Sequence, residues 1–262
     1  MSIFDYLFVD IADPRVHDWP FMSNPWKIIA IIGIYLYMIY VYLPSFMSDK
    51  KPYSLKGIIV VYNIFQLFAC ITIIYGLATS GWTTRYRLIC EPVDYSENAM
   101  AVRMASYMWW TLLLKMTELL ETIIFVLRKK YNQVSSLHVY HHISTLSAAW
   151  IVCKYVPGGL VTFTPIVNSF IHIFMYSYYL LSTLSRGPKM QKILMCVKSR
   201  LTMLQLVQLV IITLQSVQIF LPGCAISNVI GFLGSANGVI NVLFFIHFYN
   251  KNYVKKKMLQ SK

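Results

Sequence analysis

Seven apolar runs, each long enough to cross a lipid bilayer as a helix, limit the folds open to this chain. About 20 residues of helix span the hydrocarbon core. Of the 262 residues, 57% are hydrophobic and only 13% are charged, whereas soluble domains carry about 25% charged residues. No internal repeat, low-complexity tract or interdomain linker separates the runs. The sequence therefore predicts an all-α integral membrane protein with seven transmembrane helices in a single membrane domain, residues 1–262. The runs are 27–47, 57–78, 105–127, 137–154, 160–183, 201–221 and 228–249.

Most Lys and Arg residues lie in alternate connections between the runs. These connections are 48–56, 128–136 and 184–200, together with the tail 250–262. Because positively charged loops stay in the cytosol, the C-terminus is expected there and the N-terminus on the external or lumenal side. The net charge of +13 then favours anionic lipid or an anionic substrate as a partner. We expect contact with a lipid bilayer and no nucleic-acid partner.

The five cysteines show no zinc-binding spacing. Cys90 and Cys224 both fall in non-cytosolic loops, where an oxidising compartment allows a disulfide. Topology alone leaves a bridge and two unrelated thiols equally open. Cys70, Cys153 and Cys196 are interpreted as small buried apolar residues.

Polar side chains recur at helical spacing in every run from the second onward. Ionisable groups inside a membrane are costly and usually face the bundle interior or a cavity. The pattern therefore predicts a six-helix bundle around a polar interior, with the first helix peripheral. The stripe consists of Asn63 and Gln66; Lys115, Glu118 and Thr122, with Glu121 on the flank; His138, His141, His142 and Thr145; Asn168, His172, Tyr176 and Tyr179; Thr202, Gln205 and Gln208; and Asn237 and Asn241.

The stretch LHVYHHIS, residues 137–144, holds three of the six histidines. A single Gln or Asn in a membrane helix usually makes a helix–helix hydrogen bond. Counted from the cytosolic ends at about 1.5 Å per residue, His141 lies roughly 6 Å deep, and Glu118 and His172 lie roughly 12–17 Å deep. Four histidines and a Lys–Glu pair at similar depth indicate chemistry rather than packing, with access from the cytosol.

Three classes of function compete for this cluster. Membrane di-iron oxygenases also use an HxxHH box, but two irons need more histidines than the six in this chain, and a single zinc held by three histidines and a carboxylate stays open. Metal-free catalysis is the second class, because a desolvated imidazole remains neutral and can act as a base or nucleophile. A receptor or transporter is the third, although no paired repeats or broken helices are visible.

Four ordered motifs resemble the ELO family of very-long-chain fatty acid elongases over most of the chain. They are KMTELLET (115–122), LHVYHH (137–142), HIFMYSYY (172–179) and TMLQLVQ (202–208). The segments 49–66, 87–96 and 244–257 also resemble the family. One position departs from its pattern: Glu121 precedes Thr122 where the family usually has Asp.

The resemblance implies the condensing step of fatty acid elongation in the endoplasmic reticulum membrane. Acyl-CoA and malonyl-CoA would give 3-oxoacyl-CoA, CoA and carbon dioxide, without metal or redox cofactor. It implies a six-helix inverted barrel around a closed-ended tunnel, with the first helix outside. The other enzymes of the elongation cycle, the reductases and the dehydratase, are implied partners, and a homo-oligomer is left open.

The resemblance also implies residue roles. His141 would take the acyl group as an acyl-imidazole, His172 would orient the thioester or the enolate, and His138 and His142 would set tautomers or move protons. Lys115 and Glu118 would hold the histidine box. The implied substrate-binding residues are Asn63, Gln66, Tyr176, Tyr179, Thr202, Gln205, Gln208 and Asn241 around the thioester, and Arg128, Lys192, Lys198 and Lys251 for the CoA phosphates. A Cys90–Cys224 disulfide is implied as well.

Overall fold

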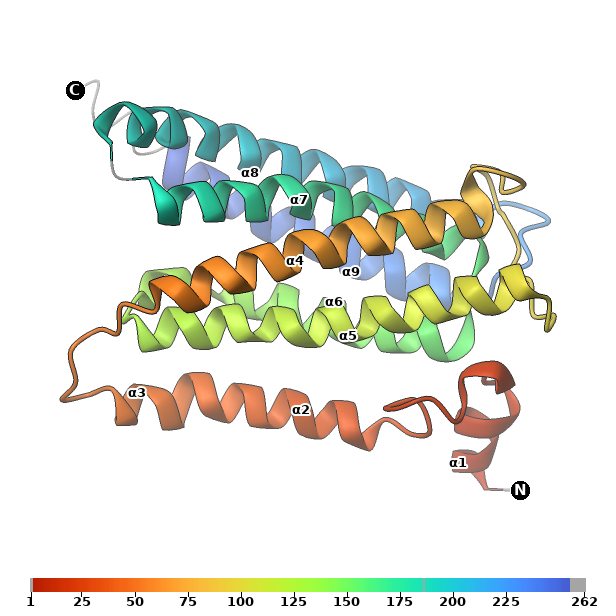
Figure 1. Cartoon of the computed structure of the whole chain (residues 1–262). Helices are drawn as coiled ribbons and strands as arrows, with labels where there is room; N and C mark the ends of the chain where they lie inside the picture. The colour runs from red at the N-terminus through yellow and green to blue at the C-terminus, as the bar shows by residue number, and fades with distance from the viewer. Residues whose placement is uncertain (1, 186, 255–262) are drawn as a thin grey trace. The chain divides into compact units, whose positions relative to one another are not determined.

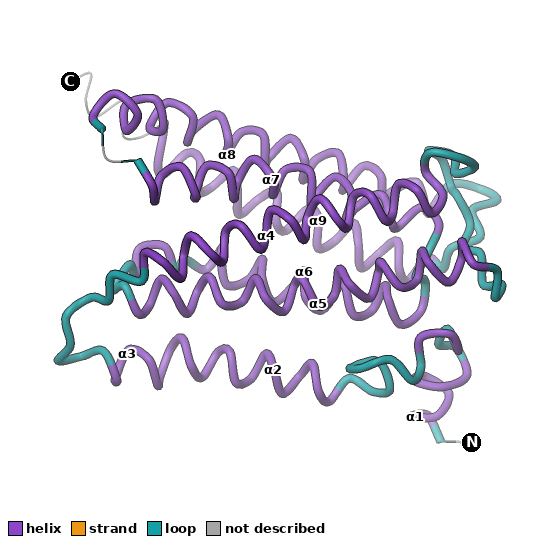
Figure 2. Tube along the Cα trace, in the orientation of Figure 1, coloured by secondary structure: helices purple, strands orange, loops and turns teal. Residues whose placement is uncertain are grey.

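The computed structural model describes residues 2–185 and 187–254. These residues form helices and connecting loops, with no strand among them (Figure 2). They group into two compact units, residues 1–55 with 75–162 and residues 56–74 with 163–262. That the whole chain forms a single membrane domain stays a prediction. The end of the predicted tail, 255–262, lies outside the described residues.

The first unit begins with a short helix, α1 (Ile3–Asp5), and an irregular segment that leads to α2 (Trp26–Tyr37). A π-helical segment, Met38–Tyr42, continues α2 into α3 (Leu43–Phe46). The helical stretch therefore runs without a break from 26 to 46, close to the first predicted run (Figure 1).

The core of the first unit is a hairpin of two long helices, α5 (Ala99–Leu127) and α6 (Ser136–Tyr155) (Figure 1). Asn98 caps α5 by accepting hydrogen bonds from the backbone of the first turn, at 3.0 and 2.9 Å. Ser135 caps α6 by accepting a bond from His138 N at 3.2 Å. Because the connection between the helices is short, they run antiparallel, and the end of α5 lies beside the beginning of α6.

Two indole groups attach the N-terminal segment to this hairpin. Trp109 Nε1 on α5 donates to the carbonyl of Pro20 at 3.0 Å, and Trp150 Nε1 on α6 donates to that of Phe21 at 2.9 Å. Both carbonyls lie a few residues before α2 begins. These bonds hold the segment before α2 against α5 and α6. Tyr35, in the last turn of α2, is buried.

The second unit contains most of α4 (Lys56–Leu77), with α7 (Phe163–Leu184), α8 (Pro188–Val217) and α9 (Asn228–Tyr249). Helices α8 and α9 pack closely, and Gly238 on α9 faces the side chain of Thr213 on α8.

Helix α8 starts well before the predicted run 201–221. Gly187 precedes it as the N-cap, Pro188 occupies a first-turn position, and good helix formers follow. Much of the connection predicted at 184–200 is therefore helical. Cys196 lies on this exposed first part of α8, so the prediction that it is buried was wrong, whereas Cys70 and Cys153 are buried.

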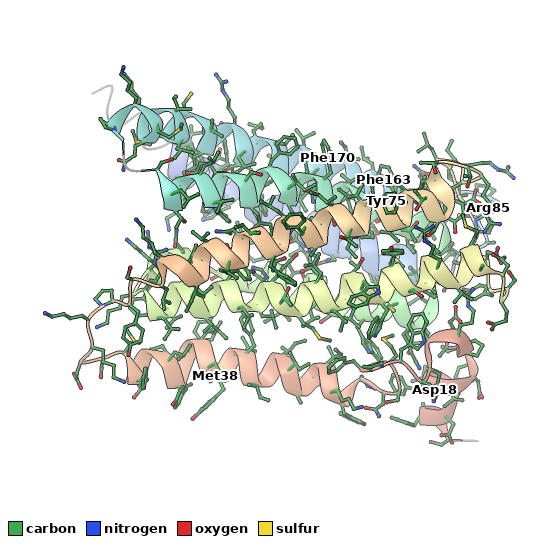
Figure 3. The ribbon with its side chains drawn as sticks, in the orientation of Figure 1. Asp18, Met38, Tyr75, Arg85, Phe163 and Phe170 are labelled. Atoms are coloured by element: carbon green, nitrogen blue, oxygen red, sulfur yellow. The ribbon has the colours of Figure 1, made fainter. Side chains whose placement is uncertain are left out.

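Five helical stretches are long and apolar enough to cross a membrane, within the residues that the structure describes: 26–46, 56–82, 159–184, 188–220 and 228–254. Large apolar side chains are exposed on them, as at Phe170 on α7 and Tyr75 near the end of α4 (Figure 3). An exposed apolar surface of this kind suits lipid. The chain is a multi-span membrane protein. That α5 and α6 also cross the bilayer stays a prediction.

Candidate active site

A buried ion pair marks the inward face of α5. Lys115 Nζ donates to both carboxylate oxygens of Glu118, each at 2.9 Å. The side chains are 8% and 1% exposed. Such a pair holds both groups in one geometry, since loss of either partner would leave a buried charge.

The predicted histidine box occupies the first two turns of α6. Residues three or four apart lie on one helix face, and the rings of His138 and His142 are 4.3 Å apart between centroids. His141 lies to the side, with its ring 5.9 Å from that of His142. His142 is buried, whereas His138 and His141 keep some exposure. A ligand therefore has better access to His141 than to His142.

Side chains of α5 reach the box across the hairpin. Thr122 Oγ1 lies 2.8 Å from His138 Nε2, a hydrogen bond. Glu121 Oε2 lies 4.0 Å from His142 Nε2, a distance too long for a hydrogen bond, so the two groups are close neighbours without a direct bond. Glu121, the residue that departs from the family pattern, therefore faces the box.

Sequence reasoning missed Tyr35, which brings α2 into the same cluster. Its hydroxyl lies 2.8 Å from Thr122 Oγ1, and the residue is 3% exposed. The neighbouring tyrosines of the same helical stretch, Tyr37, Tyr40 and Tyr42, are 54%, 56% and 46% exposed. A buried tyrosine usually finds a partner for its hydroxyl, but the sequence carries no signal that separates Tyr35 from the others.

The second unit holds a separate imidazole group on α7. Asn168 Nδ2 and His172 Nε2 lie 3.3 Å apart, and both residues are buried. The ring of His172 is 5.6 Å from that of the fully buried Tyr176. Tyr179 extends this aromatic row, with its ring 6.2 Å from that of Tyr176.

The remaining predicted polar residues of the second unit fall into three groups. Gln205 and Thr202 reach across to other elements, since Gln205 Nε2 lies 3.4 Å from Met175 Sδ, and Thr202 Oγ1 lies 3.2 Å from the Tyr253 hydroxyl. Asn241 donates within its own helix to Asn237, at 2.8 Å to the carbonyl and 3.0 Å to Oδ1. The other three are buried: Asn63, Gln66 and Gln208. Their contact with substrate stays a prediction.

The four basic residues predicted to bind CoA phosphates lie on or near α5, α8 and α9. Arg128 follows α5 and is half-buried. Lys192 and Lys198 are exposed on the first part of α8, and Lys251 is exposed just beyond α9. Cys90 and Cys224 are both disulfide-bonded.

The loop around Cys90 carries a charged network outside the membrane-spanning segments. Asp94 accepts hydrogen bonds from Ser96 Oγ at 2.7 Å and from Asn98 Nδ2 at 2.9 Å. Arg85 lies 3.1 Å from its carboxylate (Figure 3). The hydrogen bond from Ser96, helped by Asn98 and Arg85, lowers the pKa of Asp94 to about 2, against the opposing effect of partial burial.

Among the described residues, no group of three or more His, Cys, Asp and Glu side chains is arranged to hold a metal ion. The first unit instead brings together a Lys–Glu pair, three histidines, a carboxylate and a hydroxyl chain. Neutral imidazoles in such a setting can act as nucleophiles or proton carriers.

Comparison with known proteins decides the family. The profile of the ELO (GNS1/SUR4) family matches residues 20–261. The chain belongs to this family. Its resemblance to the elongases, first seen in the four motifs, is thereby confirmed. Very long chain fatty acid elongase 7 of Drosophila melanogaster is 39% identical over 246 residues, which are 94% of this chain and 74% of that protein.

Mammalian members of the ELO family are equally similar. Very long chain fatty acid elongase 7 of Rattus norvegicus is 39% identical over 250 residues, 95% of this chain and 88% of the rat protein. Very long chain fatty acid elongase 4 of Homo sapiens is 38% identical over 248 residues, 94% of this chain and 77% of the human protein. The match covers all elements that carry the candidate site.

Proposed function

We propose that the protein is a condensing enzyme of very-long-chain fatty acid elongation. It joins acyl-CoA to malonyl-CoA and yields 3-oxoacyl-CoA, CoA and carbon dioxide. The observation that carries the proposal is the cluster in the first unit of an ELO-family chain: the histidine box faces Thr122 and Glu121 of α5, the same helix that holds the buried Lys115–Glu118 pair. The reaction is redox-neutral, so the proposal requires no redox cofactor, and it assigns no step to a metal.

His141 is the proposed nucleophile, because it is the histidine of the box that lies to the side of the His138–His142 pair and keeps some exposure. Its neutral imidazole nitrogen attacks the thioester carbonyl, the carbon–sulfur bond breaks, and CoA leaves as a thiol after protonation. The product is an acyl-imidazole. His138 and His142 carry the proton, and a covalent intermediate divides one difficult step into two.

Malonyl-CoA then loses carbon dioxide, and the electron pair of the broken carbon–carbon bond forms the enolate. The enolate carbon attacks the acyl carbon, the carbon–nitrogen bond to His141 breaks, and the His141 nitrogen takes up a proton from solution through His138 or His142, which restores the neutral imidazole. Lys115 lies in the same cluster and would attract the malonyl carboxylate before it leaves. His172, with Asn168 beside it at 3.3 Å, is proposed to orient the thioester or the enolate.

The proposal includes the surroundings that the family resemblance implies. The protein would lie in the endoplasmic reticulum membrane with its N-terminus in the lumen and its C-terminus in the cytosol. Helices two to seven would form an inverted barrel around a closed-ended tunnel. The reductases and the dehydratase that complete each cycle would act on its product.

The test is a reconstituted condensation assay. Purified protein receives malonyl-CoA labelled in its free carboxyl carbon and a panel of C14–C26 acyl-CoAs, without NADPH. We expect release of labelled carbon dioxide and one 3-oxoacyl-CoA product for each accepted chain length. An intact preparation that turns over none of the acyl-CoAs would contradict the proposal.

The nucleophile has its own test. With acyl-CoA alone, the intact mass of the protein should rise by one acyl group, and His141→Ala should abolish both this adduct and condensation. His247→Ala is the matched control, because His247 is an exposed histidine on α9 outside the cluster. An adduct that persists in His141→Ala would refute the assignment.

A further inference from the structure

Three side chains from three helices form one hydrogen-bonded chain in the first unit. Tyr35 on α2 lies 2.8 Å from Thr122 on α5, and Thr122 lies 2.8 Å from His138 Nε2 on α6. Tyr35 is 3% and Thr122 is 0% exposed. Water therefore cannot replace a missing partner at the tyrosine or the threonine.

The number of protons in this chain selects the direction of its hydrogen bonds. Each hydroxyl has one hydrogen, and each of the two bonds needs one hydrogen between its heavy atoms. If Tyr35 donates to Thr122 and Thr122 donates to His138, both hydroxyl hydrogens are used. His138 Nε2 is then an acceptor, and its proton resides on Nδ1.

The two other arrangements each leave a buried hydroxyl hydrogen without an acceptor. If His138 Nε2–H donates to Thr122, either the Tyr35 hydrogen or the Thr122 hydrogen is left over. Thr111 and Thr145 donate to the carbonyl four residues earlier, at 2.8 Å each, but Thr122 makes no such bond among the described residues. An unsatisfied buried donor disfavours these arrangements by about 10-fold or more.

We propose that Tyr35 is a positioning residue that acts through Thr122 to hold His138 in the Nδ1–H tautomer. The proposal rests on the proposed function, in which the histidine box carries the chemistry. His138 then carries an N–H donor on Nδ1. The residue keeps some exposure, and its ring lies 4.3 Å from that of His142 between centroids. Helix α2 thereby determines which nitrogen of His138, in the histidine box on α6, is the proton donor.

The tautomer of His138 determines on which side of the ring a proton is available for catalysis. A general acid must carry its proton on the nitrogen that faces the reacting group. The Tyr35 hydroxyl keeps Thr122 in the rotamer that points at His138. Without it, Thr122 can turn and donate to the carbonyl four residues earlier, as Thr111 and Thr145 do. His138 Nε2 then loses its donor, both tautomers become populated, and a fraction of molecules presents an acceptor in place of the donor. Turnover should fall by that fraction, while substrate binding should change little.

The variants isolate each hydroxyl of the chain. Tyr35→Phe removes the first donor and keeps the ring. Thr122→Val removes the middle hydroxyl with little change of shape, and Thr122→Ser restores it. Tyr40→Phe is the matched control, because Tyr40 belongs to the same helical stretch and is 56% exposed.

Nitrogen-15 NMR of histidine-labelled protein reads the tautomer directly and needs no enzymatic activity. The signal lost in His138→Gln identifies His138. We expect the Nδ1–H tautomer in the wild-type protein, Thr122→Ser and Tyr40→Phe, and a mixture in Tyr35→Phe and Thr122→Val. An unchanged His138 signal in Tyr35→Phe would overturn the proposal.

Steady-state kinetics gives the second readout. In Tyr35→Phe we expect kcat to fall by about 2- to 5-fold, in proportion to the share of His138 in the other tautomer, with KM nearly unchanged. The double variant with Thr122→Val should be no slower than Thr122→Val alone, since both act through one chain. The relay would be overturned if kcat fell as much in Tyr40→Phe as in Tyr35→Phe. It would also be overturned if the losses of kcat in the two single variants added up in the double variant. Failure of the wild-type protein to condense substrates would instead refute the proposed function, and NMR would still judge the relay.

Discussion

Replacing Glu118 by Gln should destabilise the protein far more than its small chemical change indicates. The substitution keeps the shape of the side chain but removes its charge, so Lys115 remains charged with a neutral partner. Both side chains are buried, 8% and 1% exposed, and both hydrogen bonds are 2.9 Å long. Removal of one member of a buried pair costs about 3–5 kcal/mol, because the remaining charge is uncompensated.

For a chain of this size, 1 kcal/mol corresponds to a shift in Tm of about 2–4 °C. Glu118→Gln should therefore lower Tm by about 6–20 °C, measured by intrinsic fluorescence in one detergent. The control is Arg85→Gln, which breaks the pair with Asp94. Because the two side chains are 45% and 30% exposed, that change should cost less than about 1 kcal/mol.

A double variant separates stability from catalysis. Lys115→Met with Glu118→Leu replaces the pair by apolar side chains of similar volume, which is often neutral or stabilising. We expect its Tm to return close to that of the wild-type protein while condensation remains lost, because Lys115 is proposed to attract the malonyl carboxylate. Recovery of both Tm and turnover would show that the pair only fills space. A wild-type Tm in Glu118→Gln would refute the reasoning from buried charge.

Two further predictions concern residues outside the histidine cluster. Asp94 has a folded-state pKa of about 2 against an ordinary value of 3.8, so its contribution to stability is present above about pH 4 and is lost as the pH falls towards 2. Asp94→Asn should therefore flatten the decline of Tm with acid in this window. In Gly238→Ala, the added Cβ would overlap Thr213, whose hydroxyl is already bonded to the Leu209 carbonyl at 2.7 Å. This should lower stability by about 1–3 kcal/mol, whereas Gly33→Ala, with nothing within 4 Å, should leave Tm equal or slightly raised; the opposite order would contradict the packing argument.

The helices could be predicted from the sequence because the signal is local. Each of the seven apolar runs is helical in the structure, since length and hydropathy alone require backbone hydrogen bonds within the segment. The start of α8 could not be predicted in this way, because residues 188–200 are not apolar enough to indicate a membrane span. They still favour helix once Gly187 and Pro188 begin it.

The residues of the candidate site could be predicted from the sequence. The contacts between them could be predicted only in part. Spacing places Lys115 with Glu118, and His138 with His142, on single helix faces. The contact of Glu121 with His142, at 4.0 Å, depends on the register between α5 and α6. No periodicity within one helix reports that register, so the role of Glu121 could not be derived from spacing.

Tyr35 shows where a single sequence stops being informative. The first helix contains several tyrosines, and tyrosines in membrane helices are usually interfacial anchors. Only the packing of α2 on α5 buries one of them and brings its hydroxyl to Thr122. A buried hydroxyl requires a hydrogen-bond partner. The structure identifies Thr122 as the partner of Tyr35, and the direction of the bonds determines which ring nitrogen of His138 carries the proton. Helix α2, whose sequence has the weakest polar pattern of the predicted spans, therefore supplies the Tyr35 hydroxyl that orients His138 through Thr122.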